Sequence, residues 1–92
     1  MDDEQKLLKQ RDLGAQGQRL RDDPLLSAIF EGLRAQYMKE WAQSDPADVA
    51  TRELKYAHLH GLLDVRAQIN AICMNGKMAA EFLAAYEEKR AA

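Results

Sequence analysis

Two Asp-Pro pairs, at residues 23–24 and 45–46, constrain the fold of this chain more than any other feature of its sequence. Aspartate is a preferred N-cap, and proline is tolerated in the first turn of a helix because its missing N–H would have no partner there. Proline also drives the residue before it out of the helical region. Each pair therefore predicts the end of one helix and the start of the next.

The segments on either side of the second pair show helical periodicity. Their apolar residues recur at spacings of three and four, which places them on one face of each helix. The pattern predicts helices over about 24–43 and 46–75. Only Ser44 and Asp45 remain for the connection, so the two helices should form an antiparallel hairpin. The expected seam consists of Phe30, Leu33, Tyr37, Leu59, Leu63 and Ile69.

The N-terminal segment is a weaker helix former. Its apolar stripe is sparse, and Gly14 and Gly17 lie inside it. Glycine in a helix interior costs about 1 kcal/mol relative to alanine. We therefore expect a marginal helix over about 3–21 with a break near Gly14. Residues 1–22 are either loosely attached to the hairpin or ordered only by a partner.

The C-terminal segment begins after Asn75-Gly76, a pair typical of a helix stop because glycine readily adopts the left-handed conformation. A short last helix over about 77–89 should follow. The fold class predicted for the whole chain is therefore all-α. With 92 residues, the chain has the length of one helical domain, spanning 1–92.

Composition and charge disfavour several classes of function. The net charge is −2, and residues 1–22 carry five basic and five acidic side chains, so no segment has the one-sign field of a nucleic-acid-binding arm. Nucleic acid is therefore an unlikely partner. No apolar run approaches the ~18 residues of a membrane span, and the acidic N-terminus is unlike a signal peptide. We expect a cytoplasmic protein without a membrane segment.

No residue pattern indicates catalysis, a cofactor or a metal. His58 and His60 are two residues apart, so on a helix they point to opposite sides and cannot hold one ion together. Neither a nucleophile elbow nor a glycine-rich phosphate loop occurs. Cys73 is the only cysteine, which excludes an intramolecular disulfide and suits a small buried apolar side chain. We therefore expect a protein that is not an enzyme and that needs no cofactor.

Aromatic and basic residues on the helices are the candidates for partner binding. Trp41 lies one turn after Tyr37, beside the hairpin turn, and aromatic residues are common anchors at interfaces. Arg52 and Arg66 face roughly the same direction because they are nearly four turns apart. Their stems either pack along the apolar stripe, with the charges paired to Glu40 or Glu31, or form a polar rim that faces a partner. The full candidate set is Tyr37, Trp41, Arg52, Arg66, Met78, Phe82 and Tyr86.

Scattered residues in the central half of the chain form a recognisable pattern. Aromatic residues precede a turn, Arg-Glu opens a long helix, and Gly-Lys closes it. The elements are Phe30, Tyr37 and Trp41, then Arg52-Glu53, then Leu59, Leu63 and Arg66, and finally Gly76-Lys77. In this run the chain resembles a group of short tailed-phage proteins. The resemblance implies a product of a phage structural or packaging gene region, and it brings no catalytic or ligand residues.

A phage-type accessory or assembly protein that works through helical protein–protein contacts is the function expected from these features. The long helix carries more apolar surface than one neighbouring helix can cover. The expected partners are a second copy of the chain, as a dimer, a larger protein complex, or both. The host-cell cytoplasm or the virion would then be its location. Two alternatives remain open: a small inhibitor of a host or defence protein, and a nucleic-acid-binding packaging or regulatory factor.

Overall fold

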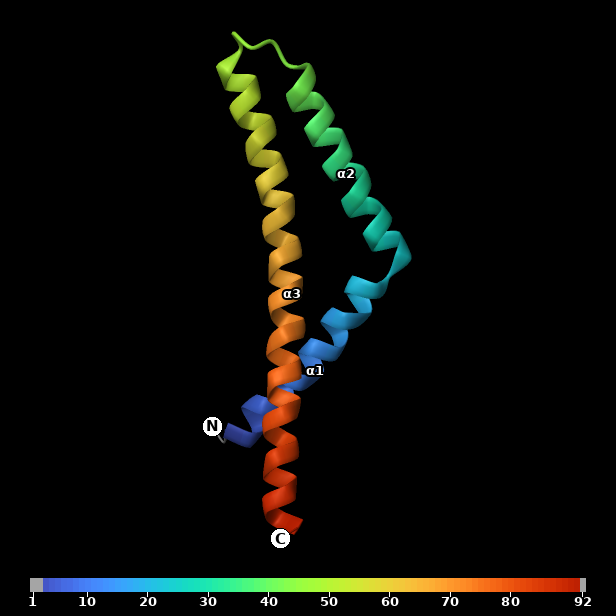
Figure 1. Cartoon of the computed structure of the whole chain (residues 1–92), viewed down its shortest axis with the longest axis vertical. Coiled ribbons are helices and arrows are strands. Elements are labelled where there is room, and N and C mark those ends of the chain that lie inside the picture. Colours follow the sequence, from blue (N-terminus) through green and yellow to red (C-terminus); the bar gives the residue numbers. More distant parts are fainter. Residues whose placement is uncertain (1–2, 92) are drawn as a thin grey trace. The chain divides into compact units, whose positions relative to one another are not determined.

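Three α-helices make up all the regular structure in the computed structural model, which describes residues 3–91. Helix α1 spans Asp3–Asp22, α2 spans Pro24–Gln43 and α3 spans Val49–Ala91 (Figure 1). The prediction of an all-α fold is therefore confirmed. The chain divides into two compact units, one of Met1–Asp22 with Gln68–Ala92 and one of Asp23–Ala67, so α3 contributes to both. Within residues 3–91, no helix has the combination of length and apolar character that crossing a membrane requires.

The first Asp-Pro pair starts α2 as predicted. The Asp23 carboxylate accepts hydrogen bonds from the backbone N–H groups of Leu25, at 2.8 Å, and Leu26, at 3.1 Å. Two N–H groups that have no partner inside the helix are thereby satisfied. At the other end, the backbone N–H and the hydroxyl of Ser44 both donate to the Trp41 carbonyl. The predicted range of 24–43 is confirmed.

The second Asp-Pro pair does not start the next helix, which begins at Val49 rather than at Pro46. Asp45 instead closes a turn: its carboxylate accepts from the N–H of Ala47, and its carbonyl accepts from the N–H of Asp48, each at 2.9 Å. Asp48 then caps α3 by accepting from the N–H of Thr51 at 3.2 Å. The prediction was wrong by three residues because a second aspartate provides a competing cap.

Helix α2 and the first part of α3 pack as an antiparallel hairpin. Two ion pairs set its register, from Glu31 to Arg66 at 3.2 Å and from Glu40 to Lys55 at 2.7 Å. Four of the expected seam residues, Phe30, Leu33, Tyr37 and Leu59, are half-buried, whereas Leu63 is exposed and Ile69 belongs to the other unit. The seam is therefore thinner than predicted, and none of residues 23–67 is fully buried.

Helix α1 is continuous over 20 residues, so the expectation of a marginal helix with a break near Gly14 is wrong. Gly14 and Gly17 are buried against α3. A methyl group added to Gly14 would lie 2.5 Å from the Cα atom of Gly76. One added to Gly17 would lie 3.1 Å from the Cγ2 atom of Ile72. The glycines that weaken the helix in isolation are therefore the residues that allow its close contact with α3.

Helix α3 continues through Asn75-Gly76, so the expected stop is also wrong, and the predicted last helix over 77–89 is the end of α3. A stop of that kind needs a left-handed glycine, and no glycine within residues 3–91 has a positive φ. Gly76 instead has no side chain at the point where Gly14 contacts α3, so the two backbones can come close. Cys73, Ala79 and Leu83 line the same side and are buried, which confirms the prediction for Cys73.

We predict that Gly14→Ala destabilises the unit of α1 and the end of α3. Alanine favours a helix by about 1 kcal/mol over glycine. Overpacking typically costs about 1–3 kcal/mol, and here the cost should reach the upper end because the methyl group meets backbone, which no rotamer change can move away. Urea unfolding followed by circular dichroism measures the difference.

The matched control for this test is Ala15→Leu, which adds bulk at the neighbouring exposed position of α1. It should change the free energy of unfolding by no more than about 0.5 kcal/mol. A Gly14→Ala variant as stable as the natural sequence would show that α1 does not pack on α3 through its glycines.

Candidate interaction site at the hairpin tip

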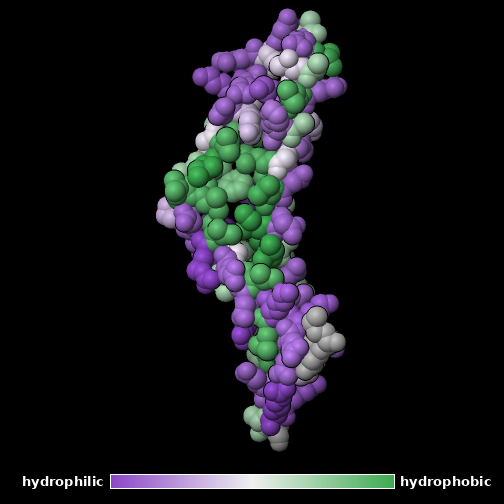
Figure 2. Space-filling model, turned by 180° about the vertical axis from the view of Figure 1, so that it is seen from behind, coloured by the Kyte–Doolittle hydropathy of each residue, from purple (hydrophilic) through white to green (hydrophobic). Residues whose placement is uncertain are grey.

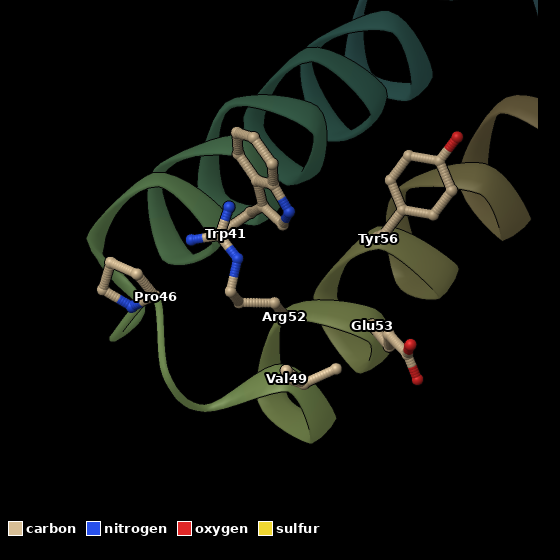
Figure 3. Close-up of a pocket in the computed structure, with 6 residues that line it drawn as sticks. All are labelled: Trp41, Pro46, Val49, Arg52, Glu53 and Tyr56. Atoms are coloured by element: carbon tan, nitrogen blue, oxygen red, sulfur yellow. The ribbon is translucent and has the colours of Figure 1, made fainter.

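An open pocket lies where α2 ends and α3 begins. Its volume is about 310 Å³, and both helices and the loop between them contribute to its wall (Figure 3). The residues that line it are Trp41, Pro46, Val49, Arg52, Glu53 and Tyr56. This pocket, here called the tip pocket, brings together Trp41 and Arg52, two of the residues predicted to bind a partner.

Arg52 connects the two helices at the tip. Its guanidinium carbon lies 4.7 Å from the centre of a Trp41 ring, in a cation–π contact. Its Nη1 atom also donates to the hydroxyl of Ser44 at 3.4 Å. Figure 3 shows the Arg52 side chain reaching from α3 to the Trp41 ring of α2. The contact holds the tryptophan ring at the pocket wall while leaving 41% of the residue exposed.

The two candidate arginines have different environments. Arg66 pairs with Glu31 across the hairpin at 3.2 Å, which is one of the two arrangements expected for it. Glu40, the other acidic residue considered, pairs with Lys55 instead of Arg52. Sequence spacing places both arginines on one side of α3, but only the register of the hairpin decides which residue lies opposite each of them.

Hydrogen bonds lower the pKa values of two carboxyl groups in this unit. The ammonium group of Lys55 and the side-chain amide of Gln36 both donate to Glu40, at 2.7 and 2.9 Å, and hold its pKa below its ordinary value. The hydroxyl and the backbone N–H of Thr51 donate to Asp48, at 2.7 and 3.2 Å, and lower the pKa of its carboxyl group. Both groups therefore stabilise the folded hairpin in their charged form.

Tyr56 and Val49 are pocket residues that the sequence analysis did not place in a site. Both are more than half exposed. The Tyr56 ring lies 4.3 Å from the ring of His60, tilted against it. The signal that could have identified them is their spacing: Val49, Arg52 and Tyr56 follow at three and four residues on the helix directly after Trp41.

The remaining candidates do not join this site. Tyr37 is half-buried, with its ring 5.4 Å from that of His58. Met78, Phe82 and Tyr86 belong to the other unit. There, Phe82 and Tyr86 are exposed and line a shallow pocket beside Leu7 at the start of α1. The seven predicted residues therefore form separate surfaces rather than one site.

The chemistry of the tip pocket suits binding of a protein side chain. Two aromatic rings and Val49 provide apolar wall, while Arg52 and Glu53 provide one charge of each sign. Such a wall accepts an apolar anchor with a polar neighbour, as is common at protein interfaces. Among residues 3–91, no three His, Cys, Asp or Glu side chains are grouped as metal ligands would be.

Comparison of the chain with models of protein families, with curated proteins and with solved structures finds no match.

We predict that the pH dependence of hairpin stability reflects Glu40 and Asp48. Folding lowers both pKa values, so their stabilisation is complete above the ordinary values of 4.5 and 3.8 and is lost as pH falls through the lower folded-state values. A Glu40→Gln, Asp48→Asn double variant should therefore lose less stability on acidification than the natural sequence, because asparagine still caps a helix but carries no charge to lose. Thermal melts between neutral and acidic pH measure the slope.

The control for the acid melts is Glu53→Gln, which removes an exposed carboxyl group from the same helix. Its acid slope should match that of the natural sequence. Equal slopes in all three proteins would contradict a stabilising role for the two hydrogen-bonded carboxylates.

Proposed function

We propose that this protein is a non-enzymatic accessory or assembly protein that acts through helical contacts, first of all with a second copy of itself. The resemblance of residues 30–77 to short tailed-phage proteins supports a role in phage structure or packaging. Under this proposal the protein works in the host-cell cytoplasm or in the virion. A larger protein complex is a second partner, reached through surfaces that the dimer leaves free.

The observation that carries the proposal is the absence of a core in the hairpin. No residue from 23 to 67 is fully buried, although the hairpin is rich in large apolar side chains. Those that are exposed are Leu25, Ile29, Met38, Trp41, Val49, Leu54, Tyr56, Leu63 and Val65. Apolar surface of this extent marks association sites on soluble proteins, because removing it from water is the main favourable term in assembly.

The charges favour a protein partner over a nucleic acid. Net charge is −2, and the ion pairs Glu31–Arg66, Glu40–Lys55 and Glu4–Arg90 join opposite charges between helices. Basic residues used in this way do not add up to the one-sign surface that attracts a phosphate backbone. Nucleic-acid binding, one of the alternatives left open by the sequence, therefore receives no support from these contacts.

The tip pocket favours a second candidate function, inhibition of a host or defence protein. An exposed tryptophan beside an open pocket is a typical anchor for a heterologous partner. This candidate and the first are compatible, because a dimer would present two hairpin tips. They differ in what is required for activity: an inhibitor depends on Trp41, whereas an assembly protein depends on the contact between copies.

Size-exclusion chromatography with light scattering tests the proposal. We expect a mass of twice the 10.4 kDa of the chain at high micromolar concentration, with dissociation on dilution. Apolar surface that remains uncovered should drive this association, and oligomers with two-fold symmetry are the commonest outcome. A Trp41→Ala variant should keep the dimeric mass, because the tip pocket is reserved for a different partner. A monomer at every concentration would contradict self-assembly.

A further inference from the structure

Asn75 and Gly76 form a dipeptide whose own groups can react with each other. Asparagine is a thermolabile residue, because the backbone nitrogen of the residue after it can attack its side-chain carbonyl carbon. Glycine leaves that nitrogen open to reaction, since it has no Cβ atom. Asn75 is exposed, so water reaches it. The chain has one other asparagine, Asn70, and it is followed by alanine.

The reaction needs no group from outside the dipeptide except water. The backbone nitrogen of Gly76 forms a bond to Cγ of Asn75, which closes a five-membered succinimide ring. The bond from Cγ to the side-chain nitrogen breaks, and that nitrogen leaves as ammonia with the proton of the backbone amide. Water then opens the ring. Attack at Cγ gives aspartate, and attack at the backbone carbonyl gives isoaspartate, whose main chain runs through the former side chain.

An intact helix α3 opposes ring closure. Asn75 and Gly76 both lie inside the helix, which runs without interruption from Val49 to Ala91. In an α-helix each backbone N–H donates to the carbonyl four residues before it, so the nitrogen of Gly76 is engaged. The fixed helical backbone of Asn75 also keeps its side-chain carbon out of line with that nitrogen. Deamidation therefore requires α3 to open locally at this point.

Helix α1 controls that opening. Asn-Gly is typical of a helix end, and the helix continues through it where α1 lies against it. A methyl group added to Gly76 would lie 2.5 Å from the Cα atom of Gly14 and 3.2 Å from the carbonyl oxygen of Gln10, both in α1. Detachment of α1 would remove this cover and restore the local preference for a helix end. The dipeptide would then be free to react.

We propose that Asn75-Gly76 is a deamidation site that the contact with α1 keeps closed, and that its conversion to isoaspartate prevents α1 from binding α3 again. Isoaspartate lengthens the main chain by one CH₂ group, so the 13-atom hydrogen-bonded rings that span residue 75 no longer fit a helix. The interruption lies next to the residue that Gly14 contacts. Opening of α1 thereby becomes a permanent change. The inference is independent of the proposed self-assembly.

The first test measures the rate of deamidation in the full chain. The protein is incubated at neutral pH, and mass spectrometry of its peptides reports conversion at each asparagine. Residue 75 should react much more slowly in the folded protein than in the same chain in guanidinium chloride. Gly14→Ala should accelerate the reaction about 5- to 30-fold, in proportion to the open fraction of this unit. Asn70 in the same helix is the internal control and should stay intact in both proteins.

Two further variants separate closure by α1 from a general loss of folding. Gly17→Ala places a methyl group 3.1 Å from Cγ2 of Ile72 and 3.2 Å from Sγ of Cys73, which are side chains that can shift. Its acceleration should be smaller than that of Gly14→Ala, whose methyl group meets backbone. Ala15→Leu, at an exposed position of α1, should leave the rate unchanged. Circular dichroism verifies that each variant is helical during the incubation.

The second test asks whether α1 stays detached after the reaction. Cys73 is buried, and the closeness of its Sγ atom to Gly17 shows that α1 covers it. Dithionitrobenzoate, which reacts with exposed thiols, therefore reports detachment. In protein that has deamidated, the fraction of molecules with a reactive Cys73 should equal the fraction with isoaspartate. Asn75→Asp adds the same charge without lengthening the main chain, so its Cys73 should stay protected.

The outcomes that would overturn the proposal are specific to its two parts. Equal deamidation rates in folded and denatured protein, or in Gly14→Ala and the natural sequence, would show that α1 does not close the site. A Cys73 that remains protected in the isoaspartate form would show that α1 binds again after the reaction. Neither result bears on whether the chain forms a dimer.

Discussion

The close contact between Gly14 of α1 and Gly76 of α3 is the constraint on which the rest of the structure depends. A single added methyl group would lie 2.5 Å from the opposing backbone, so only glycine permits this approach. The contact makes α1 a continuous helix despite its glycines and keeps α3 helical through a sequence typical of a stop. Two local preferences are thus overridden by one contact between residues 62 positions apart in the sequence.

A consequence of close helix contact is a small core. Where α1 meets α3, the buried side chains are Cys73, Ala79 and Leu83, and two of these are small. The hairpin of α2 and α3 has no fully buried residue. Large apolar side chains remain on the outer surfaces of both units, from Leu25 in α2 to Phe82 in α3. Burial of that surface by a partner is the physical basis of the proposed assembly function.

Local signals in the sequence predicted the parts of the fold that depend on local chemistry. Asp23-Pro24 begins α2 because an aspartate cap and a first-turn proline act within three residues. The start of α3 was missed by three residues because Asp48 is an equally good cap. The roles of Gly14 and Gly76 were not predictable, since glycine has the same local signature in a stop and in a contact. Only the distant partner distinguishes the two.

The candidate site, like the fold, was predictable where local chemistry decides and not where tertiary contacts decide. Trp41 and Arg52 were identified from their residue types and lie together, because the turn between them is short. Tyr56 and Val49 were missed as pocket residues because membership depends on the rotation of α3 about its axis. Met78, Phe82 and Tyr86 were candidates together with Trp41 because of their residue types, although they belong to another unit. Residue type thus indicated which side chains could bind, and three-dimensional register decided which of them share a surface.

The central claim is that the hairpin carries an apolar face that a second copy covers. Hydrogen–deuterium exchange measured at low and high protein concentration tests this claim most directly. The account predicts that peptides covering residues 25–36 of α2 and 54–65 of α3 become more protected at high concentration, because association suppresses opening of those helices. Peptides within residues 3–22 should exchange at the same rate at both concentrations. Equal exchange of the hairpin peptides at both concentrations, in a sample shown to dimerise, would contradict the claim.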